Sequence, residues 1–373
     1  MKARAVVAIA IIQSILLLAH LFLYLTWTGF CDTPAPAALL ALRLSLTILA
    51  FSFVAAALLS YYFDGLLVTA LYRVAAVWLG FLNYLFFGAV LTQIAWGVLK
   101  LARLDHNPAF ERPLLGWIGI GLGAATAVYG LINARWVRVR RISIALPGLP
   151  ACWRGRTALV ASDLHLGHIN GIGFSRRIVS MAARLMPDVI LLAGDFFDGA
   201  RVDPNTQAAP FAQLAPPFGV FFATGNHDEF GDTPGYLAAL KRAGVRVMAN
   251  EKVIADGLQI LGIPYRDAAS PIRIKAVLDS MQFDRTRASI LISHVPNRLP
   301  IVEQAGVSLQ VSGHTHGGQF APFTWITRRI FGKFTYGLHA FGGLQVFTSY
   351  GAGTWGPPMR VGTSPEVVLI QFE

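Results

Sequence analysis

The hydrophobic and polar positions divide the chain into two parts with different patterns. A membrane-spanning helix needs about 20 predominantly apolar residues, and four stretches reach that length: 5–25, 38–63, 75–99 and 114–134. Beyond these, short apolar runs alternate with amphipathic stretches. We therefore predict a membrane domain with four transmembrane helices in residues 1–141 and a second domain in residues 142–373.

The first apolar stretch is predicted to be a retained helix, because the apolar core of a signal peptide is only about 7–15 residues long. The orientation follows from the basic residues of the short flanking segments. If the N-terminus lies inside, the inner segments hold Lys2, Arg4, Arg135, Arg138, Arg140 and Arg141, and the outer loops hold Lys100, Arg103 and Arg112. This bias predicts that both termini lie in the cytoplasm.

Residues 135–141 form a basic segment that directly follows the fourth apolar stretch. Basic residues at this place are attracted to anionic lipid headgroups, so we expect a juxtamembrane anchor. A nucleic-acid-binding patch is the weaker interpretation, because the segment directly abuts a span. We accordingly predict no nucleic-acid partner.

The pattern of the second part predicts an α/β domain whose sheet is at least partly parallel. An amphipathic helix is predicted at 174–185, and further helices are predicted at 236–243 and 272–281. Strands are predicted at 157–162, 189–193, 219–224, 245–248, 252–255, 259–261, 290–292, 308–311, 345–348 and 367–372.

Composition narrows the classes of protein further. The chain is 54% hydrophobic and 14% charged, whereas soluble domains carry about a quarter charged residues. A purely soluble protein and a disordered chain are therefore both disfavoured. Two cysteines in 373 residues exclude a disulfide scaffold.

Polar residues with ligand chemistry follow five of the predicted strands. In order, the segments are Asp163-Leu-His165, Gly194-Asp195-Phe-Phe-Asp198, Gly225-Asn226-His227-Asp228, Ser293-His294 and Gly313-His314-Thr-His316. The carboxyl ends of the strands are where open α/β sheets gather their sites. A lone histidine is commonly a core residue, but five such clusters predict a site.

The candidate ligands offer oxygen and imidazole nitrogen without thiolate, which suits Mn²⁺, Fe, Zn²⁺ or Mg²⁺. In Asp163-x-His165 and His314-x-His316, alternate residues of an extended chain point to the same face. With Asp195, Asn226 and His294 they make seven ligands. Seven are too many for one tetrahedral ion but fit two ions about 3.5–4 Å apart.

This order of motifs resembles the calcineurin-like metallophosphoesterase superfamily over residues 157–320, and the glycine-rich segment 349–360 is similar to that of membrane-attached bacterial members, predicted phosphohydrolases. The resemblance implies a four-layer α/β/β/α sandwich and a bacterial inner-membrane location. It implies two sets of metal ligands that share Asp195: Asp163, His165, Asp195 and His316 for one ion, and Asp195, Asn226, His294 and His314 for the other. It also implies that His227 contacts phosphate and protonates the leaving group, and that Asp198 orients His227.

Several residues remain open between two interpretations. Arg360 is a candidate phosphate contact or part of a structural salt bridge, and His168 is a candidate substrate contact or a surface-loop residue. Asp228 belongs either behind the metal ligands or to a solvated turn. The aromatic and basic segment 320–336 suits a membrane-facing lip or a capping loop packed on its own core.

The predicted function is that of a membrane-anchored, two-metal phosphoesterase that cleaves phosphoester or pyrophosphate bonds. Four spans favour a lipid-linked substrate, and the analogy with bacterial relatives suggests UDP-2,3-diacylglucosamine. The alternatives are a general phosphodiesterase or phosphatase on soluble substrates and a catalytically silent membrane binding module. A metal-dependent amidohydrolase is disfavoured, because its His-x-His motif comes early, whereas here it comes last.

Overall fold

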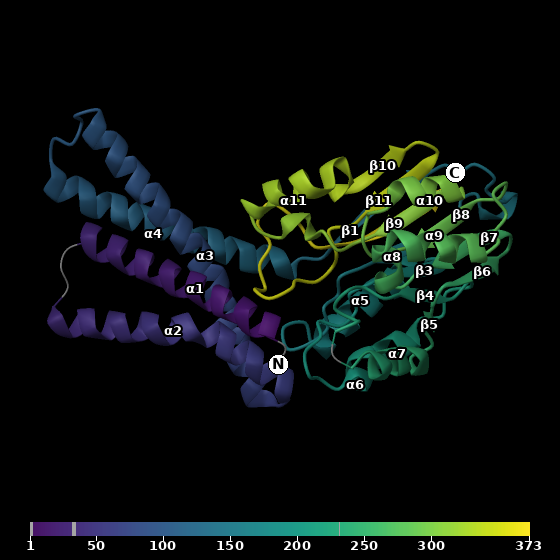
Figure 1. Cartoon of the computed structure of the whole chain (residues 1–373), viewed down its shortest axis with the longest axis horizontal. Helices are drawn as coiled ribbons and strands as arrows, with labels where there is room; N and C mark the ends of the chain where they lie inside the picture. Colours follow the sequence, from purple (N-terminus) through teal and green to yellow (C-terminus); the bar gives the residue numbers. More distant parts are fainter. Residues whose placement is uncertain (1–2, 32–34, 231) are drawn as a thin grey trace. The chain divides into compact units, whose positions relative to one another are not determined.

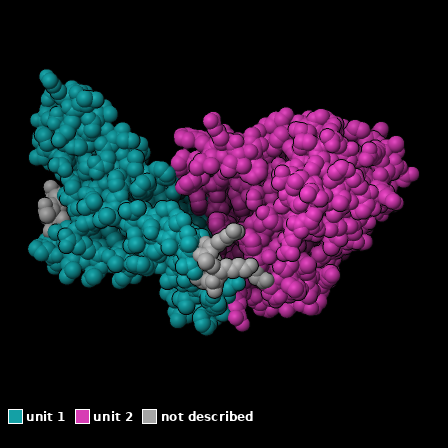
Figure 2. All heavy atoms as spheres, viewed as in Figure 1, with its two compact units in different colours: residues 1–132, 356–359 teal, residues 133–355, 360–373 magenta. Residues whose placement is uncertain are grey.

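The computed structural model describes residues 3–31, 35–230 and 232–373, so that Lys2, used above for orientation, lies outside them. The chain forms two compact units, coloured separately in Figure 2. Unit 1 comprises residues 1–132 and 356–359, and unit 2 comprises residues 133–355 and 360–373. The predicted domain boundary after residue 141 stays a prediction.

Unit 1 is built from four long helices, each long and apolar enough to cross a bilayer. They are α1 (Ala3–Phe30), α2 (Pro36–Tyr62), α3 (Leu66–Leu101) and α4 (Pro108–Arg135). Gly88 of α3 and Gly119 of α4 lie so close that a Cβ on either would overlap the other's main chain. Small residues at such contacts are typical of helices that pack within a membrane.

A short segment from far along the sequence completes unit 1. Residues 356–359 belong to it, and the fully buried Met359 packs against Gly80 of α3, where a Cβ would overlap its side chain. Unit 1 therefore includes four residues whose chain neighbours, Trp355 and Arg360, belong to unit 2.

Unit 2 contains two six-stranded sheets (Figure 1). The first sheet has the order β1 (Arg138–Ile144), β12 (Glu366–Phe372), β2 (Thr157–Ala161), β3 (Val189–Ala193), β4 (Val220–Ala223), β5 (Arg246–Val247). The second has the order β10 (Gly337–Phe341), β11 (Leu344–Thr348), β9 (Leu309–Ser312), β8 (Ser289–Ile292), β7 (Leu258–Gly262), β6 (Glu251–Ala255). Strands β2 to β5 run parallel, as do β7, β8, β9 and β11.

The two sheets pack face to face, with helices on both outer faces. Val160 and Leu191 of the first sheet and Ile290 and Val311 of the second share the core between them. The first sheet is covered by α5 (Ile172–Leu185), α6 (Pro204–Ala208) and α7 (Thr233–Arg242), and the second by α8 (Tyr265–Ala269), α9 (Pro271–Ser280) and α10 (Leu299–Ala305). The predicted four-layer α/β/β/α sandwich is confirmed.

The basic segment 135–141 runs from the end of α4 into a strand of unit 2. Residues 138–144 form strand β1, which pairs in parallel with β12 from Arg138 opposite Glu366 onward. Ile142 and Ile144 face the core between the sheets, whereas Arg141 and Ser143 are exposed. This alternation is that of a half-buried strand, and the contact of its arginines with lipid headgroups stays a prediction.

Candidate active site

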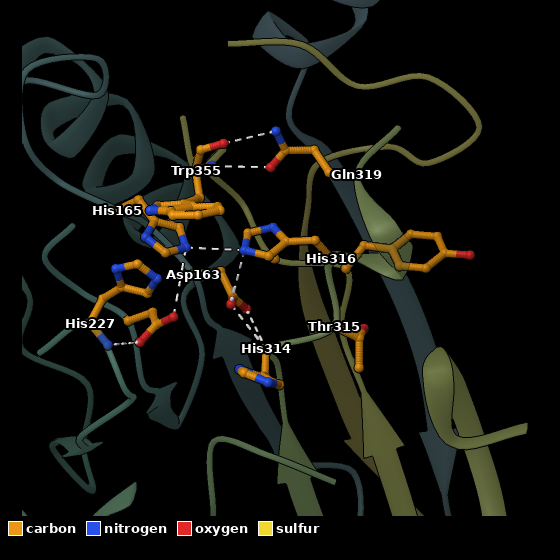
Figure 3. A network of polar contacts seen from close by, with 12 residues as sticks. Asp163, His165, His227, His314, Thr315, His316, Gln319 and Trp355 are labelled. Carbon is orange, nitrogen blue, oxygen red and sulfur yellow. Dashed lines mark hydrogen bonds and ion pairs between the residues drawn. The ribbon is translucent and has the colours of Figure 1, made fainter. Parts of the chain in front are cut away.

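The five predicted clusters meet at one edge of the sandwich, and Figure 3 shows residues of the first, third and fifth of them. Three of them follow β2, β3 and β4 of the first sheet, and two follow β8 and β9 of the second. Because the carboxyl ends of these strands lie at the same edge, residues far apart in sequence become neighbours. All seven predicted ligands lie there: Asp163, His165, Asp195, Asn226, His294, His314 and His316.

A first group of potential ligands consists of Asp163, His165 and His316. The Nε2 atoms of His165 and His316 are 3.0 Å apart, and Asp163 Oδ1 lies 3.4 Å from Nε2 of His316. One ligand atom from each of the three lies within 4.8 Å of the others, a spacing that could hold a metal ion. Asp163 and His165 are buried, at 0% and 1% exposure.

A second group consists of Asp195, His294 and His314. Nε2 of His294 lies 3.1 Å from Asp195 Oδ2, and Nδ1 of His314 lies 3.0 Å from Asn226 Oδ1. His294 donates Nδ1–H to the carbonyl of Ala193 at 2.8 Å, which leaves its Nε2 facing the group. Metal-binding histidines are commonly held by such a bond from the second ring nitrogen.

Asp195 connects the two groups. Its Oδ2 faces His294 and also lies 3.7 Å from Nε2 of His165. Its Oδ1 accepts a bond from the main-chain N–H of His227 at 2.8 Å. Asp195 also forms a third potential ligand group with His165 and His227. The carboxylate is thus placed between both groups, as a bridging ligand would be.

The backbone at these positions adopts a conformation that is rare for residues other than glycine. Five of the seven have positive φ: Asp163 at 54°, His165 at 46°, Asp195 at 51°, His314 at 69° and His316 at 47°. Each such conformation costs of order 1–3 kcal/mol, and such residues cluster at functional sites. The sharp turns after the strands aim these side chains at one point.

The close approach of the loops after β3 and β4 requires glycine at position 225. A Cβ on Gly225 would overlap the carboxylate and main-chain nitrogen of Asp195. The two loops can approach each other this closely only because residue 225 carries no side chain.

Burial sets the protonation of the histidines in the first group. Burial lowers the pKa of His165 to about 3 and the pKa of His316 well below its ordinary value. In the second group, burial lowers the pKa of His314 to about 4. These imidazoles are therefore neutral at neutral pH and offer the lone pair that a metal ion requires.

The carboxylates differ from one another. Burial raises the pKa of Asp163 to about 6. Burial acts in the same direction on Asp195, but the charge of His294 and a hydrogen bond from it outweigh burial and hold the pKa of Asp195 below its ordinary value. Asp195 is accordingly the most strongly anionic of the buried ligands.

His227 lies at the half-buried edge of the cluster. Its ring centroid is 4.9 Å from that of His165 and 5.4 Å from both Phe230 and Trp355. Its Nδ1 lies 3.1 Å from the main-chain carbonyl of Asp198. The contact between these two residues therefore runs through the backbone of Asp198, while its carboxylate accepts a bond from Ala200 N–H at 2.7 Å.

Asp228 is fully buried and lies behind the ligands. It accepts hydrogen bonds from the main-chain N–H groups of Phe197 at 2.9 Å and Gly225 at 2.8 Å. It thus ties the loop after β3 to the loop after β4. Of the two interpretations open from the sequence, the solvated turn does not describe this residue.

Arg360 is also fully buried, and its guanidinium binds main-chain carbonyls. It donates to Tyr350 at 2.8 Å, to Gly353 at 2.5 Å and to His316 at 3.1 Å, and Nη2 lies 3.0 Å from Nδ1 of His316. Its place is behind a ligand, where it holds the glycine-rich segment to the loop of His316. His168 is likewise buried, at 1% exposure, and is not a surface-loop residue.

Two aromatic residues beside His227 were not predicted from the sequence as part of the site. Trp355, at 56% exposure, is held by two hydrogen bonds of 3.0 Å with Gln319, one to each main-chain polar group (Figure 3). Phe230, at 54% exposure, also lies beside His227. Gln319 follows His316 after two glycines. This position next to the His314-Thr-His316 motif is the one sequence feature that could have indicated a place for Gln319 near the site.

The chain thus combines a two-sheet sandwich with carboxylate, imidazole and amide groups that meet at one sheet edge. This combination is that of an α/β protein with a candidate metal centre. The chain belongs to the calcineurin-like metallophosphoesterase family, whose sequence pattern, described as calcineurin-like phosphoesterase, matches residues 156–318. A metallophosphoesterase of Aquifex aeolicus is 30% identical over 265 residues, which cover 69% of this chain and 98% of that relative.

A transmembrane protein with a metallophosphoesterase domain from Danio rerio is 32% identical over 278 residues. The match covers 70% of this chain and 63% of the relative, so the chain spans less than two thirds of that protein's length. A solved structure of a protein from Thermus thermophilus aligns with a TM-score of 0.37 at 14% identity, over 53% of this chain and 89% of that one.

Proposed function

We propose that this protein is a membrane-anchored phosphoesterase that uses two divalent metal ions. The observation that carries the proposal is Asp195, a buried carboxylate that faces His165 of one ligand group and His294 of the other. One ion would be held by Asp163, His165, Asp195 and His316, and the other by Asp195, Asn226, His294 and His314. The donor set of carboxylate oxygen, amide oxygen and imidazole nitrogen fits Mn²⁺, Fe, Zn²⁺ or Mg²⁺.

The ions would supply Lewis-acid activation of water and of a phosphoryl oxygen. The chain's own groups have distinct tasks. His227 lies beside the ligand His165 and is only half-buried, so it can contact a phosphate and donate a proton to the leaving oxygen. The main-chain carbonyl of Asp198 orients its ring through Nδ1.

We propose further that the substrate is lipid-linked, with UDP-2,3-diacylglucosamine as the first candidate. Two observations support this proposal. Unit 1 contains four helices of membrane-spanning length, and the exposed rings of Trp355 and Phe230 each lie against His227. Apolar rings beside a proton donor suit a phosphoester whose neighbouring groups are apolar.

The proposed location is a bacterial inner membrane, with several spans and the catalytic unit on the cytoplasmic side. The support is the excess of Lys and Arg in the segments that would lie inside.

Hydrolysis assays on the purified full-length protein test these proposals. With Mn²⁺ added, we expect turnover of bis-p-nitrophenyl phosphate or UDP-2,3-diacylglucosamine, lost in Asp195→Ala and retained in Asp279→Ala, an exposed aspartate of α9. Trp355→Ala should lower the rate on the lipid substrate more than on the aryl diester. Equal losses on both substrates would contradict the lipid-linked proposal, and no metal-dependent turnover on either would favour the binding-module alternative.

A further inference from the structure

The helix α11 (Phe323–Phe331) turns its apolar side chains outward. Trp325, Ile326 and Ile330 are 73%, 57% and 69% exposed, whereas Thr324 and Thr327, on the other side, are half-buried. Surface helices of soluble domains show the reverse arrangement, with the apolar face toward the core. The sequence left open whether this segment is a lip or a capping loop packed on its own core, and the exposed residues do not pack there.

The charges around α11 identify what would cover this face. Arg328 and Arg329 lie in its last turn, and Lys333 follows. Residues 304–365 contain no Asp or Glu at all. A basic helix with exposed Trp and Ile side chains is typical of helices that lie in the headgroup region of a bilayer, and anionic lipids attract each nearby Lys or Arg.

The helix is directly connected to the candidate active site. It begins four residues after Gln319, which holds Trp355 beside His227. At its other end, the ring centroid of Phe331 lies 6.0 Å from that of His314. Both ends of α11 are thus tied to residues that contact or belong to the site.

We propose that α11 inserts Trp325, Ile326 and Ile330 into the headgroup region of an anionic bilayer and so holds the site at the lipid surface. The inference goes beyond the proposed function, since it concerns an interaction surface that would exist whatever the substrate is. Only its consequence, direct access to a lipid-linked phosphoester, rests on the proposed function.

The test uses the full-length protein in nanodiscs that contain phosphatidylglycerol. With Cys31 and Cys152 replaced by serine, an environment-sensitive fluorophore is attached at Ile326→Cys or, as a matched control, at Ile272→Cys, an isoleucine 81% exposed on α9. We expect the label at 326 to be quenched at least twofold by lipids that carry a nitroxide near the headgroup, and the label at 272 to be unaffected. Arg329→Glu should reduce the quenching at 326.

Equal insensitivity of both labels to the nitroxide lipids would overturn the proposal. So would a label at 326 that is shielded from a water-soluble quencher yet unaffected by the nitroxide lipids, because protein would then cover α11. Hydrolysis of the soluble aryl diester, measured on the same samples, reports the proposed function separately from the docking of α11.

Discussion

Replacing Arg360 by methionine distinguishes a buried clamp from a substrate contact. The guanidinium donates to the carbonyls of Tyr350, Gly353 and His316 at 2.8, 2.5 and 3.1 Å, and the residue is 0% exposed. Methionine retains much of the volume but no donor, so three buried carbonyls lose a charged partner. Burial lowers the pKa of Arg360 to about 10, so the group is still charged at neutral pH.

The size of the effect follows from the number of bonds. A hydrogen bond to a charged group contributes about 1.5–3 kcal/mol, and neighbouring bonds are not additive. We therefore expect Arg360→Met to lower the free energy of unfolding of unit 2 by about 3–5 kcal/mol. For a domain of this size that corresponds to a midpoint about 6–20 °C lower.

Hydrogen–deuterium exchange of the peptides that contain β2 and β12, followed with temperature, measures this effect without contributions from α1 to α4. The clamp predicts faster exchange and weaker metal binding through His316, with an unchanged KM for the fraction that binds metal. If exchange and metal content matched the wild type while KM rose, the reasoning would be refuted and Arg360 would be a substrate contact.

Two further variants test the site's construction. Gly225→Ala should displace the carboxylate of Asp195 and lower the metal content measured by mass spectrometry. Gly173→Ala, where a Cβ meets open space, should leave the metal content unchanged. Equal metal content in both variants would contradict the steric explanation. Burial raises the pKa of Asp198 from 3.8 to about 7, so the folded chain holds a proton that the unfolded chain releases and stability falls as pH rises from about 4 to about 7. Asp198→Asn should remove this dependence, so its stability relative to the wild type should increase between about pH 4 and pH 7 in thermal melts, and parallel profiles would refute it.

The strand ends and their ligands could be predicted from the sequence because both are local features. Apolar runs such as Val189–Ala193 define buried strands, and Asp195 follows within two residues. The parallel arrangement then brings such residues to one edge. The four long helices were equally evident, since span length is a property of composition alone.

Other features depend on contacts that sequence patterns do not reveal. The strand at Arg138–Ile144 was not predicted, because its pairing partner β12 lies more than 220 positions further along the chain. The surroundings of Arg360 depend on carbonyls that the glycine-rich segment brings together, so its clamp geometry was not predictable. The outward apolar face of α11 became clear only when the exposure of Trp325 and Ile326 was known.

The most direct test of the central claim is the metal content of the purified full-length protein, measured together with its hydrolysis of bis-p-nitrophenyl phosphate. The account predicts two divalent ions per chain and metal-dependent turnover. Asp195→Ala should lose both ions or retain at most one, without turnover, while Asp279→Ala should match the wild type. An Asp195→Ala protein that retains two ions and full turnover would contradict the account, because Asp195 would then not join the two metal sites.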